Sequence, residues 1–402
     1  MDRDPIDRLT STARRVTHDR VRAVYHALAD GLETYLSPLI LDRGGLQEVC
    51  RRNGTLRYYG TSEAVTLDVP DAPDEPTTRI LDRDGEHLIP APFVGELPGV
   101  TLVGRYPMPI YGRRLVLEAI GRPDVALLNL YYAIAEGGPL RKTDDRRTLD
   151  CAVLLHNCWD QGYFHWTTEG LTRLEGIEQY SERTGRRPTL VLGPDPPSFQ
   201  VESLRLLGYD ESDWIEWDGR ATTVERFVVP SMRRGTRGSE AGLVAHRWLR
   251  DRLRSAVAER IDSDRFASRV YVSRADADRR RVTNEADVME VLAEYGFEAY
   301  RLGEMSFVEN VALFAGADVV VAPHGAGLTN LLYAEDASVV ELFRQNNTPT
   351  YFVLARQFGH RHRYVECRAR GVDLWVDPAE LETAVVEELD ATGLDYESAD
   401  RR

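Results

Sequence analysis

Lysine is almost absent from this sequence. Its 402 residues include 50 basic side chains, and Lys142 is the single lysine among them, so all the others are arginines. A phosphate-binding P-loop needs a lysine in the pattern GxxxxGK followed by Ser or Thr, and no such pattern surrounds Lys142. An epimerase or oxidoreductase that relies on a Tyr-x-x-x-Lys pair lacks its lysine too. The composition therefore argues strongly against both enzyme classes.

Long apolar runs and cysteines are also scarce. No stretch approaches the roughly 18 to 20 apolar residues of a membrane-spanning helix, and the N-terminal segment MDRDPIDRL is charged. The four cysteines, Cys50, Cys151, Cys158 and Cys367, form no CxxC pair and no zinc spacing. We expect a soluble cytoplasmic protein with reduced thiols and no bound metal or cofactor. Peripheral association with the inner face of the membrane is the alternative location.

Basic residues are fewer than acidic residues in this sequence. The chain has 65 acidic and 50 basic residues, which gives a net charge of -15. This balance argues against a surface that binds nucleic-acid phosphates. An acidic surface with little lysine stays hydrated when salt screens its charge, which is typical of a halophilic archaeon. An acidic protein from a GC-rich genome, where arginine replaces lysine, is the other explanation.

The N-terminal part of the chain has the pattern of a small β-rich region. Hydrophobic residues make up 43% of the sequence, enough for the cores of two or three domains. Residues 20–36 have the spacing of an amphipathic helix. Residues 55–140 alternate short apolar runs with turns rich in Pro and Gly, which is typical of strands. We predict a region over 1–145, of unknown role.

Strands alternate with helices from about residue 150. The segments CAVLLHN, TLVLG, DWIEW and VERFVVP are predicted strands. Helices are predicted over 165–185, with Leu171, Leu174 and Ile177 on one face, and over 198–210, with Ser198 as a candidate N-cap. This order favours a parallel sheet in a Rossmann-like domain over 150–240.

A second set of the same kind follows a helix near 240–260. Its predicted strands are RVYVSR, EAYRL, VVVAP and SVVELF. Ser306 and Glu309 form a capping box at the start of one helix, and Asp377 is the predicted N-cap of the last. We therefore predict an α/β protein in which a second Rossmann-like domain, 241–402, faces the first across a cleft.

The strand VVVAP ends in the turn HGAGLTN, residues 324–330. In open α/β sheets, ligands bind beyond the carboxyl ends of the strands. Glycines allow a close approach and φ values that other residues resist, and amides at the start of a helix favour phosphate. His324 can donate a hydrogen bond or carry charge beside that phosphate. A dinucleotide fingerprint would need a third glycine, and a tight turn without a ligand is the simpler alternative.

Two stretches resemble a known family. The segment from YVSRADADRRRVTNE through HGAGLTN to VVELF, and the upstream HNCWDQGYFHWTTEGLTRL, are similar to the family 61 glycosyltransferases, which include capsular polysaccharide biosynthesis proteins. The resemblance covers about 150–345, and its motifs are specific in combination. It implies a GT-B-like fold and an inverting transferase that uses a nucleotide-sugar donor without a bound metal.

The resemblance implies that the C-terminal half binds the donor. Arginines after the strand RVYVSR would clamp the diphosphate, and Glu341 would hold ribose hydroxyls. The alternatives are a solvated arginine loop over 279–281 and a surface carboxylate. The predicted donor-binding residues are Arg274, Arg280, His324, Gly325, Ala326, Gly327, Leu328, Thr329, Asn330 and Glu341, with Ser273 and Arg281 as secondary candidates.

The N-terminal half would then bind the acceptor and supply the base. His165 and Glu169 are four residues apart at the start of a helix, so they share a face. We predict that Glu169 is the catalytic base and that His165 orients it, although the reverse assignment and an ordinary surface pair stay open. His156 and Asn157 are secondary candidates.

The predicted function is transfer of a sugar from a nucleotide-sugar to a glycan or lipid-linked glycan, in the synthesis of surface polysaccharide or glycoprotein glycans. A catalytically silent nucleotide- or glycan-binding protein of the same fold is the alternative. Asp276 and Asp278 have the DxD spacing that holds a divalent ion in other transferases. That spacing lies in an arginine-flanked loop, so we do not favour a metal site there.

Overall fold

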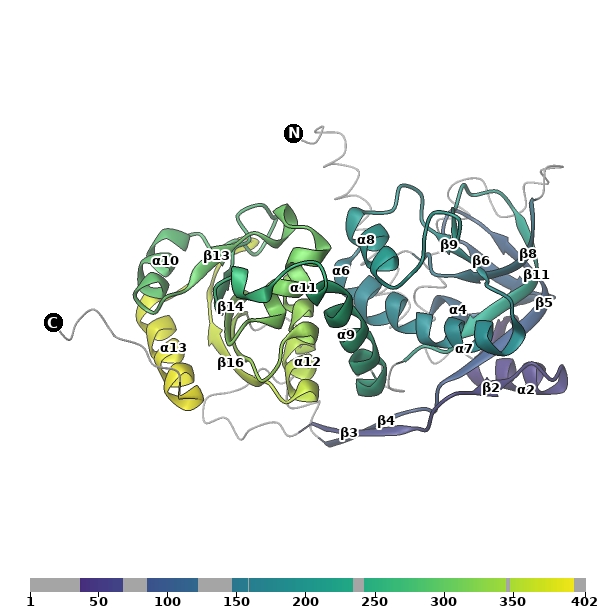
Figure 1. The fold of residues 1–402 in the computed structure, drawn as a ribbon, viewed down its shortest axis with the longest axis horizontal. Coiled ribbons are helices and arrows are strands. Elements are labelled where there is room, and N and C mark those ends of the chain that lie inside the picture. The colour runs from purple at the N-terminus through teal and green to yellow at the C-terminus, as the bar shows by residue number, and fades with distance from the viewer. Residues whose placement is uncertain are drawn as a thin grey trace.

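Two sheets organise the part of the chain that the structure describes (Figure 1). The structure is a computed structural model, and it describes residues 37–67, 85–121, 147–157, 159–233, 242–344 and 348–393. The helix expected over 20–36, Lys142 and Cys158 lie outside these residues. One half holds a nine-stranded sheet of parallel and antiparallel strands, and the other a five-stranded parallel sheet. The predicted α/β class is confirmed.

The nine-stranded sheet joins the predicted N-terminal region to the strands that follow it. The strand order is β1-β7-β6-β5-β11-β8-β9-β10, and β2 pairs with β5. Strand β5 runs antiparallel to β11, so strands from both sides of the predicted boundary near 145–150 share one sheet. The three-part division itself stays a prediction. The strands are β1 (Ile40–Leu41), β2 (Arg57–Tyr58), β5 (Phe93–Val103), β6 (Met108–Tyr111), β7 (Arg114–Val116), β8 (Arg147–Leu154), β9 (Thr189–Leu192), β10 (Trp214–Glu216) and β11 (Thr222–Pro230).

The helix predicted over 165–185 is built from four successive helical segments. It begins with α6 (Tyr163–His165), continues as a π-helical turn over 166–170 and a 3-10 turn over 171–173, and ends as α7 (Leu174–Thr184). The predicted stripe of Leu171, Leu174 and Ile177 is fully buried, which confirms the face that packs on the sheet. The other helices of this half are α2 (Arg43–Arg52), α4 (Leu117–Ile120) and α8 (Ser198–Leu206). The predicted cap at Ser198 is wrong, because Pro197 occupies the N-cap position of α8.

The five-stranded sheet has the order β13-β12-β14-β15-β16, with every neighbouring pair parallel. In chain order this is 2-1-3-4-5, and ligands bind such sheets where the order reverses, between β12 and β14. Val319 and Val321 of β14 pack on one face of the sheet, and Val320 packs on the other. The strands are β12 (Arg269–Val272), β13 (Glu298–Tyr300), β14 (Val319–Pro323), β15 (Ser338–Phe343) and β16 (Arg361–Glu366).

Helices cover both faces of this sheet. In Figure 1, α10 and α13 lie on the outer face, while α11 and α12 lie toward the other half, and α9 packs on α11. The capping box of Ser306 and Glu309 and the N-cap Asp377 are confirmed. The sequence did not predict α12, β16 or the β17–β18 hairpin. The elements are α9 (Leu243–Ala258), α10 (Glu285–Glu294), α11 (Phe307–Ala315), the 3-10 helix η6 (Ala326–Tyr333), α12 (Thr350–Phe358), α13 (Pro378–Thr392), β17 (Arg368–Arg370) and β18 (Asp373–Trp375).

A hairpin of β3 (Glu63–Leu67) and β4 (Gly85–Ile89) connects the two halves. It runs along one edge of the molecule (Figure 1). Val65 and Ile89 pack against Phe352 of α12, which belongs to the other half. The N-terminal region therefore contacts the C-terminal sheet's helices directly.

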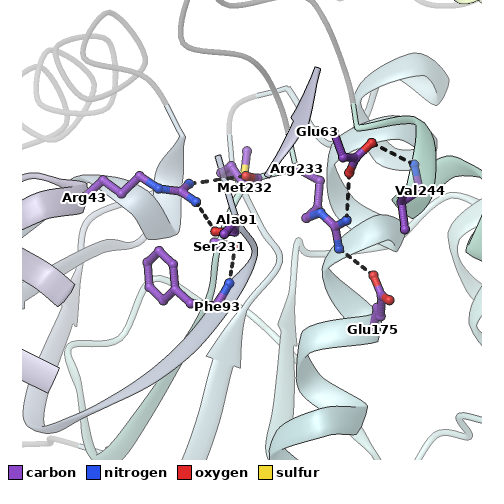
Figure 2. Close-up of polar contacts among 9 residues, drawn as sticks. All are labelled: Arg43, Glu63, Ala91, Phe93, Glu175, Ser231, Met232, Arg233 and Val244. Atoms are coloured by element: carbon purple, nitrogen blue, oxygen red, sulfur yellow. Dashed lines mark hydrogen bonds and ion pairs between the residues drawn. The ribbon is translucent and has the colours of Figure 1, made fainter. Parts of the chain in front are cut away.

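Charged groups fix the base of this hairpin (Figure 2). Arg233, which follows β11 and is buried, pairs with Glu63 of β3 and with Glu175 of α7. The second oxygen of Glu63 accepts a hydrogen bond from Val244 N at the start of α9. Arg233 thus ties the hairpin to α7 of the nine-stranded half, and Glu63 ties it to α9.

No helix in the described ranges is both long enough and apolar enough to cross a membrane. Cys50, Cys151 and Cys367 are free thiols in the interior, as predicted.

Candidate functional site

The carboxyl ends of β12 and β14 bring the main predicted donor-binding residues together. The two strands are paired neighbours. Arg274 follows the end of β12 by two residues, and His324 directly follows β14. Both therefore lie at the reversal of strand order, where the fold is expected to bind a ligand.

Gly325 lies against the guanidinium of Arg274. A Cβ atom added to Gly325 would overlap Arg274 Nη1 and come within 2.9 Å of Arg274 Cζ. The φ of Gly325 is 175°, an extended value that any residue adopts. The expectation that these glycines provide unusual φ values is therefore wrong. Gly325 makes room for an arginine, and a Cβ on Gly327 would come within 2.9 Å of Leu302 Cδ1.

Arg274 has donor groups that the protein leaves unused. Its Nη2 donates to Arg279 O at 3.3 Å, while its Nε is buried without a hydrogen-bond partner. Burial lowers the pKa of Arg274. A half-buried guanidinium with a free donor is suited to an anionic ligand.

Arg280 is held beside it. Its Nη1 donates to His324 O at 2.8 Å, and its φ of +57° is unusual for a residue with a side chain. Burial, together with the charges of Arg279 and Arg274, lowers the pKa of Arg280 to about 10. Arginines that lower one another's proton affinity favour a bound anion.

The secondary candidates after β12 are engaged in the fold. Arg281 makes an ion pair with Asp373 of β18, with 2.6 Å between Nη2 and Oδ2. Ser273 donates to Glu285 of α10 at 2.8 Å. The structure thus separates Arg281 and Ser273, which hold this loop in place, from Arg274 and Arg280, which contact the HGAG turn.

His324 and Glu341 are in direct contact. His324 Nδ1 is hydrogen bonded to Glu341 Oε1, and His362 Nε2 lies 2.9 Å from Glu341 Oε2. Burial alone would raise the pKa of Glu341, but the hydrogen bonds from the two histidines outweigh it and lower this pKa to about 2. Both oxygens of Glu341 have protein partners, so its contacts differ from the ribose contact predicted for it.

The rest of the turn continues as the 3-10 helix η6. It begins at Ala326, inside the stretch 324–330 that was predicted as a turn. Ala326 and Gly327 are half-buried, and the first amides of a helix lack acceptors within it. Leu328 and Thr329 are buried. The first amides of η6 are therefore the backbone donors that a phosphate could use.

Asn330 connects the two halves of the protein. Its Nδ2 donates to Gly327 O at 3.0 Å, and its Oδ1 accepts from Tyr163 OH of α6 at 2.5 Å. Since its side chain already has these partners, the structure places Asn330 in a contact between α6 and η6.

His165 and Glu169, the predicted catalytic pair, lie together. His165 Nδ1 is 3.3 Å from Glu169 Oε1, and their side chains are 33% and 21% exposed. The π-helical turn 166–170 carries Glu169, and such turns are frequent at functional sites. The ring of Trp159 lies 5.4 Å from that of His165. The predicted pairing is present, but nothing in the structure tests its role.

Aromatic side chains connect the two candidate sites. The ring of Phe164 is 6.1 Å from that of Tyr351 in α12, and the ring of Tyr351 is 5.0 Å from that of His324. The contact between α6 and η6 is thus filled by side chains, while His165 and Glu169 stay partly exposed. Phe164, the neighbour of His165, therefore lies two ring contacts from His324 of the HGAG turn.

Comparisons with known proteins bear on this arrangement. Residues 163–340 match the family described as Glycosyltransferase 61. The resemblance predicted from the sequence is confirmed over that stretch, whereas the archaeal origin stays a prediction. The match includes α6, the π-helical turn, the loop after β12 and the whole of η6.

Curated relatives carry transferase names as well. The chain is 31% identical over 97 residues to the EGF domain-specific O-linked N-acetylglucosamine transferase of Gallus gallus, and 30% identical to those of Bos taurus and Mus musculus. Each match covers 23% of this chain and 18% of the relative. The chain therefore spans less than a fifth of the length of these relatives. Together, the family match and the relatives support a glycosyltransferase.

Two secondary candidates lie just before the family 61 match and have local partners. His156 Nδ1 is 2.6 Å from Asp160 Oδ2, and both side chains are buried. Asn157 Oδ1 accepts from Trp159 N at 2.7 Å. These contacts shape the segment that leads from β8 to α6.

Sequence analysis missed Arg173, a buried cation inside the family 61 match. Its Nη1 donates to Leu154 O at 2.8 Å, while Nε and Nη2 have no hydrogen-bond partner. Burial lowers the pKa of Arg173 to about 10, opposed by the charges of Glu118 and Glu169. The four-residue spacing between Glu169 and Arg173, which places the two side chains on one face of a helix, could have identified it. Tyr351 and His362 were missed because α12 and β16 were not predicted.

The described residues contain no cluster of three His, Cys, Asp or Glu side chains that could hold a metal ion. Asp276 and Asp278, the DxD pair, are exposed in the loop after β12.

Proposed function

We propose that the protein is an inverting glycosyltransferase that moves a sugar from a nucleotide-sugar to a glycan or lipid-linked glycan. One observation carries the proposal: Arg274, Arg280 and the HGAG turn converge at the switch point of a parallel sheet, within the stretch that matches the family. The two sheets would form a GT-B-like pair of domains.

The donor's diphosphate would lie between the arginines and the start of η6. The chain carries a net charge of -15, so its overall field repels a nucleotide, and a local group of cations is needed to bind one. The free Nε of Arg274 and the first amides of η6 supply fixed donors. Such donors stabilise the charge that develops on the departing diphosphate, which is the main term in transfer without a metal.

Glu169 would act as the base. It takes the proton from the acceptor hydroxyl while that oxygen bonds to the anomeric carbon, and the bond from this carbon to the phosphate oxygen breaks. Arg173 is four residues further on, and its buried charge interacts with that of Glu169. This cation favours the ionised carboxylate, the form able to accept a proton. His165 would orient it.

The relatives' name suggests the first sugar to test. They are called N-acetylglucosamine transferases, so we propose N-acetylglucosamine as the first donor sugar, and surface polysaccharide or glycoprotein glycan as the product. A cytoplasmic enzyme at the inner membrane face of a halophilic archaeon would suit that pathway.

A thermal-shift screen in molar KCl with UDP, GDP, CDP, CMP and dTDP tests the donor site. Binding stabilises the native state, and a ligand at 100 times its Kd adds about 2.7 kcal/mol. We expect one nucleotide to stabilise wild type and His156→Ala, a control away from the donor site, and to stabilise His324→Ala less. If no nucleotide stabilised any of the three proteins, the proposal would be contradicted.

A catalytically silent binding protein is the second candidate. The filled contact between α6 and η6 favours it, since a transferase needs the acceptor to reach the donor. Nucleotide-sugar turnover separates the two, because a silent protein binds the nucleotide without releasing it from the sugar.

A further inference from the structure

A buried carboxylate joins two histidines next to the proposed phosphate site. Glu341 of β15 is 1% exposed. One of its oxygens is hydrogen bonded to His324 Nδ1, and the other lies 2.9 Å from His362 Nε2 on the neighbouring strand β16. The side chain of His362 is 2% exposed, and it contacts the same carboxylate as His324. The pairing fixes the ring of His324 and leaves Nε2 as its nitrogen for a ligand.

Charged or polar groups face His324 from β15, from α12 and from the loop after β12. Glu341 contributes the negative charge, and the phenol of Tyr351 from α12 packs on the ring at 5.0 Å. Arg280 donates to the carbonyl of His324, and Arg274 lies over the next residue, Gly325. Two cations therefore oppose a positive charge on His324, and one carboxylate favours it.

A bound diphosphate would change this balance. With Nδ1 donating to an ionised Glu341, the neutral imidazole carries a lone pair on Nε2 that would repel a phosphate oxygen. A proton on Nε2 converts that acceptor into a charged donor. The negative charge of the ligand offsets the two arginines, so protonation becomes favourable only in the complex.

We propose that His324 takes up a proton from solvent when the diphosphate of the donor binds, and that Glu341 is the positioning residue that permits this uptake. The inference rests on the proposed function, because it requires a diphosphate at the HGAG turn. No proton is consumed in sugar transfer: the Nε2–H group donates a hydrogen bond to the leaving diphosphate and keeps its proton until release.

Proton uptake makes nucleotide affinity depend on pH. Since the complex binds one more proton than the free protein, affinity falls as pH rises, by up to roughly tenfold per pH unit. Measurements between pH 7.5 and 8.5 avoid the second ionisation of the phosphate, which lies near pH 6. Arginines and backbone amides alone would give an affinity that is flat over this interval.

Isothermal titration measures the uptake directly. UDP, GDP, CDP and dTDP are each titrated at pH 7.5 in two buffers with different ionisation enthalpies. We expect roughly half to one proton taken up by wild type with the nucleotide that binds. Glu341→Gln keeps the shape but removes the charge, so its uptake should fall toward zero and its affinity should become independent of pH.

Glu388→Gln is the matched control. Glu388 is also a buried carboxylate of this half, paired with Arg361 and Ser338, which begins β15. We expect it to take up protons as wild type does. If Glu341→Gln does not fold, His324→Asn replaces it and should still bind the nucleotide, more weakly and without uptake.

The outcomes distinguish this inference from the proposed function. Binding to wild type without proton uptake overturns the inference and leaves the donor site intact. Uptake by Glu341→Gln equal to that of wild type places the proton elsewhere and also overturns it. No binding by any of the four nucleotides overturns the proposed function, and the inference with it.

Discussion

At Gly325, the space for a side chain is already taken by Arg274. Gly325→Ala would push its methyl group into the end of a flexible arginine, so the fold should tolerate the change while the guanidinium moves. We expect nucleotide affinity to fall at least about tenfold, or about 1.4 kcal/mol, measured by titration calorimetry. Gly44→Ala in α2, whose nearest neighbour is 3.8 Å away, is the control. Equal affinity in both variants would show that Arg274 has no role in binding.

Glu341 also predicts how the protein responds to acid. Its pKa falls from 4.5 in the unfolded chain to about 2 in the fold, so its stabilising effect is present above pH 4.5 and is lost as pH falls through about 2. Glu341 contributes ~3 kcal/mol in total to the free energy of unfolding. Roughly 2 kcal/mol of this contribution should be lost between pH 6 and pH 3. Urea unfolding of wild type and Glu341→Gln tests this. A stability difference that does not change with pH would contradict it.

The acceptor-side pair allows a test of roles. Glu169→Gln removes the base, so kcat should fall at least about 100-fold while nucleotide affinity stays unchanged. His165→Asn removes the orienting group, so a smaller loss is expected. Steady-state assays of nucleotide release, with nucleotide binding as the control, compare them. A greater loss in His165→Asn would reverse the two roles, and no loss in either would leave them an ordinary surface pair.

Among the elements, the β3–β4 hairpin depends on one buried arginine. Arg233→Met would leave the carboxylates of Glu63 and Glu175 without their cation. Burial already raises the pKa of Glu175 while the cation is present. We expect a loss of about 3–5 kcal/mol in unfolding free energy, measured in urea. Arg252→Met, which breaks a half-exposed pair with Glu178, should cost under about 1 kcal/mol. Similar losses of unfolding free energy in Arg233→Met and Arg252→Met would show that Arg233 does not fix the base of the hairpin.

The sequence predicted the elements with strong periodicity and missed those without it. Strand β14 was predicted with both of its ends because it is a buried apolar run, and helix α11 was predicted with its N-cap because a capping box marks it. Helix α12 is buried on nearly all sides, so it has no polar stripe to identify it. Strand β16, RHRYVE, is mostly polar and becomes a strand by pairing with β15.

The same reasons limited the candidate site. Arg274 and His324 could be predicted because each follows a clear strand in a recognisable motif. The contact of Glu341 with two histidines could not, since it depends on the pairing of β15 with the unpredicted β16. The π-helical turn that carries Glu169 left no mark in the spacing of apolar residues.

For the whole molecule, the net charge of -15 predicts a response to salt. Screening of self-repulsion should raise the free energy of unfolding on the order of 1 kcal/mol between 0.1 M and 2 M KCl. Urea unfolding at several KCl concentrations measures this. Stability that is flat or falls with KCl would favour the GC-rich explanation of the composition over the halophilic one.

In the proposed function, the carboxyl ends of β12 and β14 bind the nucleotide end of a nucleotide-sugar. Titration of wild type, Arg274→Met and Arg281→Met with the nucleoside diphosphates tests it most directly. Both arginines follow β12, but Arg281 is held in an ion pair with Asp373. We expect Arg274→Met to bind at least about tenfold more weakly than wild type and Arg281→Met to bind like wild type. Equal binding by all three proteins would contradict it.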